Sequence, residues 1–257
     1  MADIFIKNRK NQKLSLVVDQ AKNQSGLVFI LHGLGGFKEQ PQIKTFTKAF
    51  KDNNYTTVIF DVADTIGASE PGNTENTCIT HHYEDLEDVI TWAATQFWYQ
   101  EPFCLAGHSL GGIAITLFAE NNPHKIKALA PISTVISGEL SLTMHSKQEL
   151  KEWQTKGYNL QESHSKPGVI KKIKWQEIED RLKYDLLPKA NQLIMPTILI
   201  VGNKDEGTPL EHQKLFLDAL PAGKKELHII KNASHTFRDK KHLDEIYLVL
   251  DNWLKKI

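Results

Sequence analysis

The Gly-x-Ser-x-Gly motif at residues 107–111 constrains the fold of this chain more than any other feature. It follows the short apolar run 103–106 and precedes the apolar run 113–119, so it predicts a sharp turn between a strand and a helix. Such a turn is crowded, and the glycines two residues before and after the serine remove side chains that would clash. The motif therefore predicts an exposed, reactive hydroxyl on Ser109, although small residues can also simply close such a turn.

Apolar runs that alternate with helical patterns predict an α/β fold with one mostly parallel, eight-stranded sheet and helices on both faces. Continuous apolar runs are typical of strands that are buried on both faces. Two of the eight strands, at 4–7 and 13–19, are expected as an antiparallel pair at the edge of the sheet. The other strands are expected at residues 27–31, 55–60, 103–106, 126–132, 197–201 and 226–230, and helices at 42–52, 83–96, 113–119, 210–220 and 242–256.

Residues 134–193 interrupt this alternation because their composition shifts to polar and charged residues. We expect them to form an inserted cap or lid within a single domain of residues 1–257. Inside the insert, residues 158–162 and 169–174 are predicted to pair as a hairpin, and 176–182 to form a helix. The lysine-rich run 166–174 is interpreted as the solvated face of that hairpin, with phosphate binding as a weaker alternative.

Composition argues against several classes of partner. Lysine plus arginine equals aspartate plus glutamate, at 31 each, and no basic block stands out, so nucleic acid is not an expected partner. No apolar run approaches the roughly 20 residues that a membrane span requires. The N-terminal residues lack the long apolar core of a signal peptide. The oligomeric state is not indicated by the sequence.

The cysteine count favours a reducing compartment. Cys78 and Cys104 do not make a disulfide framework, and Cys104 falls in the strand before Ser109, where it is expected to be buried. No role is assigned to Cys78, which is expected in a loop. We therefore expect a cytoplasmic location.

Three polar residues are expected to meet at the carboxyl ends of the parallel strands. Asp205 and His235 each follow a predicted strand, and ligands bind at this edge in open α/β sheets. His235 would take the proton of Ser109, because a serine hydroxyl is a poor nucleophile without a base. Asp205 would hold the imidazole in one tautomer. Two alternatives are that Asp205 only caps a turn and that the adjacent Glu206 is the acid.

Two backbone amides are candidates for an oxyanion hole. The residue after the nucleophile, Leu110, is one, and Leu34, in the glycine-rich segment 32–36, is the other. The neighbouring histidines, His32 and His108, are expected to support the turns around the site. A plain glycine-rich turn is the alternative for residues 33–36, which match neither a Walker nor a dinucleotide motif.

Together these motifs resemble the α/β-hydrolase superfamily of serine hydrolases over nearly the whole chain. The similarity is greatest to bacterial cinnamoyl and feruloyl esterases and serine-aminopeptidase-like hydrolases, including the insert strings at 153–158 and 183–186. These relatives often carry an Asp-x-Arg-Gly-x-Gly-x-Ser loop. Here the loop is residues 61–69, in which the arginine and the first glycine are absent.

The resemblance implies a cofactor-free, metal-free enzyme that hydrolyses small to medium carboxylic esters through an acyl-enzyme. Trp153 and Tyr158, with Met144 and Trp175, are predicted to wall a pocket for the substrate, although for each residue taken alone a place in the core of the insert is favoured over contact with the substrate. The same catalytic residues could serve a thioesterase, a peptidase or a lipid acyl hydrolase. A binding protein that has lost turnover is a further alternative.

Overall fold

A single eight-stranded sheet organises the computed structural model, which describes residues 3–163 and 165–257. From β2 onwards the strands follow the order β2-β4-β3-β5-β6-β9-β10, with β1 at the edge, and only β1 and β2 run antiparallel to their neighbours. This confirms the predicted sheet. The strands are β1 (Ile4–Lys7), β2 (Lys13–Asp19), β3 (Gly26–Leu31), β4 (Tyr55–Phe60), β5 (Phe103–His108), β6 (Ile126–Ile132), β9 (Thr197–Gly202) and β10 (Lys225–Ile230).

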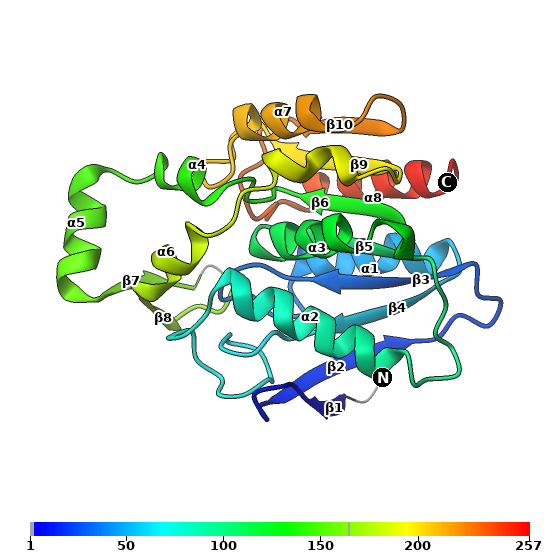
Figure 1. The fold of residues 1–257 in the computed structure, drawn as a ribbon, viewed down its shortest axis with the longest axis horizontal. Helices are drawn as coiled ribbons and strands as arrows, with labels where there is room; N and C mark the ends of the chain where they lie inside the picture. The colour runs from blue at the N-terminus through cyan, green and yellow to red at the C-terminus, as the bar shows by residue number, and fades with distance from the viewer. Residues whose placement is uncertain (1–2, 164) are drawn as a thin grey trace.

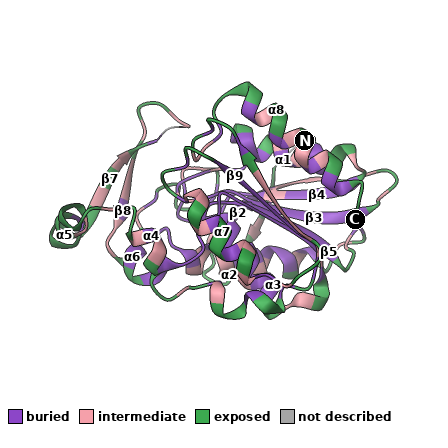
Figure 2. Cartoon of the chain, turned by 90° about the horizontal axis from the view of Figure 1, so that it is seen from above, coloured by how far each residue is buried: buried purple, intermediate pink, exposed green. Residues whose placement is uncertain are grey.

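Helices cover both faces of the sheet (Figures 1 and 2). The helices α1 (Pro41–Asp52) and α8 (Lys240–Leu254) pack together on one face. The other face carries α2 (Ile79–Ala93), α3 (Leu110–Asn121) and α7 (Leu210–Ala219). Two short 3-10 helices, η1 (Pro123–Lys125) and η2 (Leu187–Gln192), lie before β6 and before β9.

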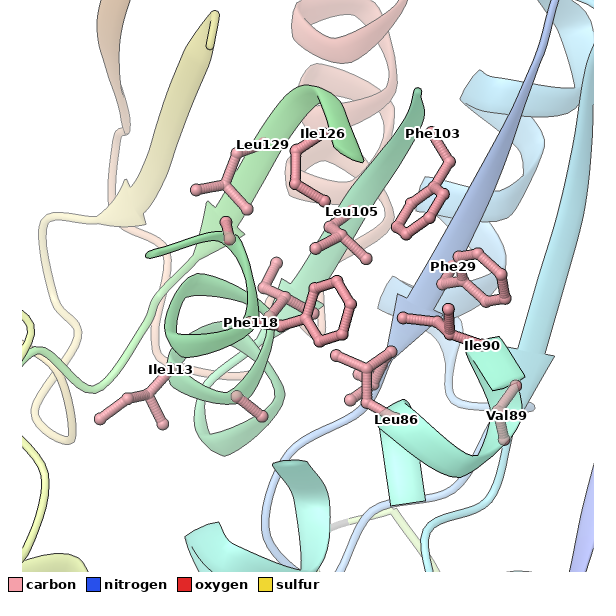
Figure 3. Packing of buried hydrophobic residues seen from close by; sticks show 14 of the residues in the cluster. Phe29, Leu86, Val89, Ile90, Phe103, Leu105, Ile113, Phe118, Ile126 and Leu129 are labelled. Atoms are coloured by element: carbon pink, nitrogen blue, oxygen red, sulfur yellow. The ribbon is translucent and has the colours of Figure 1, made fainter. Parts of the chain in front are cut away.

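Alternate residues of each central strand enter two separate cores. In β3, Phe29 packs towards α2 and α3, whereas Val28 packs towards α1 and α8. In β5, Phe103 and Cys104 divide in the same way. Figure 3 shows Phe29 and Phe103 beside Phe118, and the rings of Phe29 and Phe103 meet edge to face with their centroids 5.0 Å apart. Burial on both faces explains why these strands read as continuous apolar runs.

Helix α2 begins four residues earlier than the sequence predicts and ends three residues earlier. Cys78 is the N-cap, and its sulfur accepts a hydrogen bond from the backbone N–H of His81. Cysteine is not among the residues that normally mark a helix start, which explains why the sequence predicts Cys78 in a loop and the helix only from residue 83. The buried Cys78 thus has a structural role that the sequence did not indicate.

The segment between β6 and β9 forms its own small group of elements. It contains α4 (Gly138–Leu142), α5 (Lys147–Lys156), α6 (Gln176–Arg181) and the antiparallel hairpin of β7 (Tyr158–Glu162) and β8 (Ile170–Lys174), as predicted for the hairpin. Figure 1 shows α5, α6 and the hairpin beyond one end of the sheet, away from the helices that cover its faces. Trp153, Ile173 and Ile178 form a small core of their own.

Candidate active site

Ser109 occupies a strained backbone position between β5 and α3. Its φ is 58° and its ψ is −117°, a conformation that non-glycine residues rarely adopt and that raises the side chain above the turn. A side chain at Gly107 would come within 2.5 Å of the carbonyl oxygen of Gly111, and one at Gly111 within 2.4 Å of the carbonyl oxygen of His32. The two glycines are therefore required for the close packing that holds the turn.

The imidazole of His235 reaches Ser109 from the loop after β10. Its Nε2 lies 3.0 Å from Ser109 Oγ, within hydrogen-bond distance for proton transfer. The loop is tied to the elbow by His108, whose Nε2 lies 2.8 Å from the carbonyl oxygen of His235. Burial, and then the charge of His235, lower the pKa of His108 to about 3. His108 is therefore neutral at pH 7, with its Nε2–H donating to the carbonyl of His235.

Asp205 completes the line of hydrogen bonds from the loop after β9. Both of its carboxylate oxygens lie 3.0 Å from His235 Nδ1. The carboxylate also accepts hydrogen bonds from the backbone N–H groups of Gly207 and Thr208 and from the Thr208 hydroxyl, at 2.8–3.0 Å. Burial alone would raise the pKa of Asp205, but the hydrogen bond and charge of His235, with the Thr208 amide, lower it to about 2. Asp205 is therefore ionised and orients His235.

The adjacent carboxylate, Glu206, is exposed and makes neither a hydrogen bond nor an ion pair with His235, so the structure favours Asp205 as the orienting acid. Asp205 is nearly fully buried, which makes its charge more effective on the imidazole than that of a solvated group. The structure thus brings Ser109, His235 and Asp205 together in one line of hydrogen bonds.

The loop after β3 lies against Ser109 and presents the amide of Leu34. A side chain at Gly33 would lie 2.8 Å from Ser109 Cβ, which shows how closely the loop approaches. Leu34 and Leu110 both line the same cavity as Ser109, and their backbone N–H groups have no hydrogen-bond acceptor among residues 3–163 and 165–257. They are therefore available to stabilise negative charge on an oxygen bound beside Ser109.

His32 connects this loop to the residues that follow β4. It is fully buried, its Nδ1 lies 2.9 Å from the carbonyl oxygen of Gly33, and its Nε2 accepts the backbone N–H of Val62 at 3.1 Å. Burial lowers the pKa of His32, so the imidazole is neutral and bridges the ends of β3 and β4.

A buried ion pair, which the sequence analysis did not identify, joins the far end of the loop after β3 to the residue that follows β4. The ammonium of Lys38, which is 1 % exposed, lies 3.0 Å from Asp61, and the same carboxylate accepts the backbone N–H of Lys38 at 2.6 Å. Asp61 begins the loop in which the expected arginine is missing. Lysine is usually exposed, so its burial could not be predicted without knowledge of its distant partner.

A cavity of about 320 Å³ opens above Ser109 between the sheet and the insert. Met144 and Trp153 line it, as predicted. The Trp153 side chain is 4 % exposed and its Nε1 donates to the carbonyl oxygen of Ile173, so most of its surface is core of the insert. The prediction that Tyr158 and Trp175 line the pocket is wrong. Tyr158 is exposed on the outer side of the hairpin, beneath the ammonium of Lys172.

The lining of the cavity is more polar than the prediction of an aromatic wall implied. The insert contributes Gln161, Ser163, Lys171 and Arg181, and the body contributes Gln40 and Gln42. Lys171 corrects the interpretation of the lysine-rich run as a wholly solvated face, because β8 turns this one lysine inwards.

In the part of the chain that the structure describes, no group of three or more histidine, cysteine, aspartate or glutamate side chains could hold a metal ion. Among the same residues, no helix has the length and apolar character that crossing a bilayer requires.

The parallel sheet, with a serine at a strand-to-helix elbow followed along the chain by an aspartate and a histidine, defines an α/β-hydrolase fold. Comparison with known families gives the same result. A family model described as serine aminopeptidase, S33, matches residues 22–240, and the chain belongs to this hydrolase family.

Curated relatives match almost the whole of this chain at low sequence identity. The mitochondrial palmitoyl-protein thioesterase ABHD10 of Bos taurus is 24% identical over 252 residues, which cover 95% of this chain and 78% of the relative. The protein of the same name from Homo sapiens is 22% identical over 245 residues, with the same coverage.

Two solved structures superpose over almost the full length. Est1E from Butyrivibrio proteoclasticus, solved with ferulic acid bound, has a TM-score of 0.81 at 20% identity, covering 98% of each chain. The α/β-hydrolase domain-containing protein 10 from mouse also has a TM-score of 0.81 at 20% identity, covering 100% of this chain and 99% of that one. At these identities the superpositions show a common fold.

Proposed function

We propose that the protein is a serine carboxylesterase that hydrolyses small to medium carboxylic esters through an acyl-enzyme on Ser109. The observation that carries this proposal is the pair of 3.0 Å contacts that link Ser109 Oγ, His235 and Asp205 below an open cavity. No cofactor and no metal ion are part of the proposal, because this chemistry needs only a base, an acid and two amides.

In the first half-reaction, His235 Nε2 removes the proton of Ser109 as the oxygen attacks the ester carbonyl. The amides of Leu34 and Leu110 stabilise the tetrahedral oxyanion, and losing one such donor typically costs about 2.7–4 kcal/mol. His235 then protonates the departing alcohol. In the second half-reaction, His235 deprotonates a water that attacks the acyl-enzyme, and the acid leaves from Ser109.

A thioesterase is the second candidate, because the curated relatives carry that name. The same serine, histidine and oxyanion hole serve a thioester, since only the leaving atom differs. The cavity favours a shorter or more polar acyl group than palmitoyl. Its volume is about 320 Å³, and glutamine, serine, lysine and arginine side chains contribute to its lining. A peptidase, a lipid acyl hydrolase and a ligand-binding protein without turnover remain alternatives that the same experiment addresses.

A matched substrate panel tests the proposal. Butyryl and palmitoyl groups would be offered as ethyl esters, as thioesters of N-acetylcysteamine and as amides, to wild type and Ser109→Ala. We expect the butyryl ethyl ester to be hydrolysed by the wild type alone. Turnover of the thioesters that is faster than turnover of the butyryl ethyl ester would favour a thioesterase. Faster turnover of the amides would favour a peptidase, and faster turnover of the palmitoyl ethyl ester would favour a lipid acyl hydrolase. Complete absence of turnover would favour a binding protein.

We further propose that the protein acts in the cytoplasm on a small-molecule ester, without nucleic acid as a partner. The balanced charge and the two buried, unpaired cysteines support this proposal. The curated relatives are named as mitochondrial, so fractionation of the source cell with a cytosolic and an organellar marker distinguishes the two locations.

A further inference from the structure

One lysine of the insert points into the active-site cavity. Lys171 lies in β8, and the side-chain stem rests on Gly35, where an added Cβ would come within 2.5 Å of Lys171 Cδ. Gly35 directly follows Leu34, and both residues line the same cavity. The stem of Lys171 therefore runs along the loop after β3 that contains Leu34 and Gly35. The lysine lines the same cavity as Ser109.

The alternation of β8 separates this lysine from its neighbours. Lys172 and Lys174 face the opposite side of the hairpin, where both lie 3.4 Å from the carboxylate of Glu75. Lys171 and Ile173 face the cavity. Among residues 3–163 and 165–257, Lys171 has no carboxylate within ion-pair distance, unlike these two lysines of the same strand.

The electrostatic setting of Lys171 lacks a compensating charge. Burial lowers the pKa of its amine, and no charged neighbour offsets that effect. The other cation of the cavity, Arg181, is already neutralised by Glu177, which lies 2.6 Å from Nη2 and 2.9 Å from Nε. The carboxylate that lines the cavity, Glu206, is exposed beside Asp205 on the histidine side. Holding an ammonium in a half-buried site is costly unless an anion binds there.

The position of Lys171 also indicates which part of an ester it would meet. His235 must protonate the leaving oxygen, so the alcohol departs on the side of His235. Lys171 lies along the loop of Leu34 and Gly35 instead. An anion held by Lys171 therefore belongs to the acyl part of the substrate.

We propose that Lys171 binds a carboxylate at the far end of the acyl group, so that the preferred substrates are monoesters of dicarboxylic acids. This inference rests on the esterase function proposed above and narrows its substrate class. The amine donates a charge-assisted hydrogen bond to the substrate carboxylate, and the cavity gains the negative charge that its own residues do not supply.

Matched esters that differ only in this charge test the proposal. Monomethyl succinate, adipate and suberate would be compared with methyl butyrate, hexanoate and octanoate. A fourth pair, 4-acetoxybutyrate and butyl acetate, places the charge in the alcohol. For each pair, the ratio of kcat/KM for the charged ester to that for the neutral ester would be measured in wild type, Lys171→Met, Lys171→Arg and Lys172→Met.

We expect the wild type to prefer at least one of the monomethyl diacids over its neutral partner. The ratio should fall at least tenfold in Lys171→Met, be retained largely in Lys171→Arg, and stay unchanged in Lys172→Met, where the lysine is paired outside the cavity. The 4-acetoxybutyrate ratio should not respond to Lys171→Met.

Three results would overturn this inference. If the ratio of kcat/KM for the charged ester to that for the neutral ester is the same in wild type and Lys171→Met, Lys171 does not bind the substrate carboxylate. Hydrolysis of the neutral esters in that case would still support the esterase function. A selective loss with 4-acetoxybutyrate alone removes the assignment to the acyl side. If wild type hydrolyses no ester of either charge and takes no fluorophosphonate label, the esterase function itself fails, and the inference with it.

Discussion

The Nε2 of His235 lies 3.0 Å from the Oγ of Ser109, although 126 residues separate the two along the chain. The sheet brings them together because β5 and β10 end at the same edge. The backbone strain at Ser109 raises the hydroxyl, and the bond from His108 to the carbonyl of His235 holds the histidine loop in place. The hydrogen bond between Ser109 and His235 thus follows from the way the sheet and its loops pack.

Removing the charge of Asp205 should impair turnover far more than substrate binding. In Asp205→Asn, the amide can donate to His235 Nδ1 and favour the wrong tautomer, so we expect kcat to fall by about 10³–10⁴-fold. Thr208→Val removes only the hydroxyl that donates to Asp205 at 2.9 Å and should cost about tenfold. Steady-state kinetics on a short-chain ester measures both, and equal losses in the two variants would contradict the assigned roles.

The burial of His82 and of His108 should each contribute stability that is lost as the pH falls from 6.5 to about pH 3. Burial lowers the pKa of His82 and of His108 from 6.5 to about 3. In this window the unfolded chain binds protons that the folded chain does not, so the stabilisation is complete above pH 6.5 and is lost as the pH falls. Each histidine contributes a slope of about 1.4 kcal/mol per pH unit.

Urea unfolding at pH 7.5, 6 and 5 measures this slope in wild type and in His108→Gln. The glutamine amide can still donate to the carbonyl of His235 but does not titrate. The slope of the free energy of unfolding against pH should be lower in His108→Gln than in wild type by up to about 1.4 kcal/mol per pH unit, the contribution of one histidine. Identical slopes in the two proteins would show that His108 is protonated in the folded protein.

Replacing Lys38 should destabilise the fold because its partner stays buried. In Lys38→Met, the carboxylate of Asp61 loses its cation inside the protein, and such changes typically cost about 3–5 kcal/mol. The exposed pair of Lys240 and Asp244 provides the control, since Lys240→Met should cost less than about 1 kcal/mol. Chemical unfolding compares the two, and similar losses would mean that the buried pair does not hold the loop.

The two aromatic residues expected in the pocket should behave differently. Trp153→Ala removes a buried ring and the hydrogen bond to Ile173, so we expect a loss of about 3–5 kcal/mol and an altered KM. Tyr158→Ala removes an exposed ring outside the cavity and should leave kcat/KM within about twofold. A large loss of activity in Tyr158→Ala would show that the hairpin moves onto the substrate.

Local patterns in the sequence were sufficient to predict the sheet and the elbow. Strands such as β3 are buried on both faces, so their apolar runs stand out, and the glycines around Ser109 reflect the backbone itself. Positions fixed by distant partners were not predictable in this way. Lys38 is buried by Asp61, and α2 starts at an unusual cap, Cys78.

The insert illustrates the same limit within the site. Its hairpin was predicted from alternation, but alternation alone does not say which side faces the body. Docking on Gly35 turns Lys171 inwards and leaves Lys172 and Tyr158 outside. The cavity lining therefore depends on how the insert packs on the sheet, which no local pattern in the chain encodes.

The reactivity of Ser109 is tested most directly by covalent labelling with a fluorophosphonate, read out by intact mass and peptide mapping. We predict a single adduct on the peptide that contains Ser109, with loss of ester hydrolysis in step with labelling, and no adduct in Ser109→Ala. Labelling at another residue, or a Ser109→Ala variant that is both labelled and active, would contradict the account.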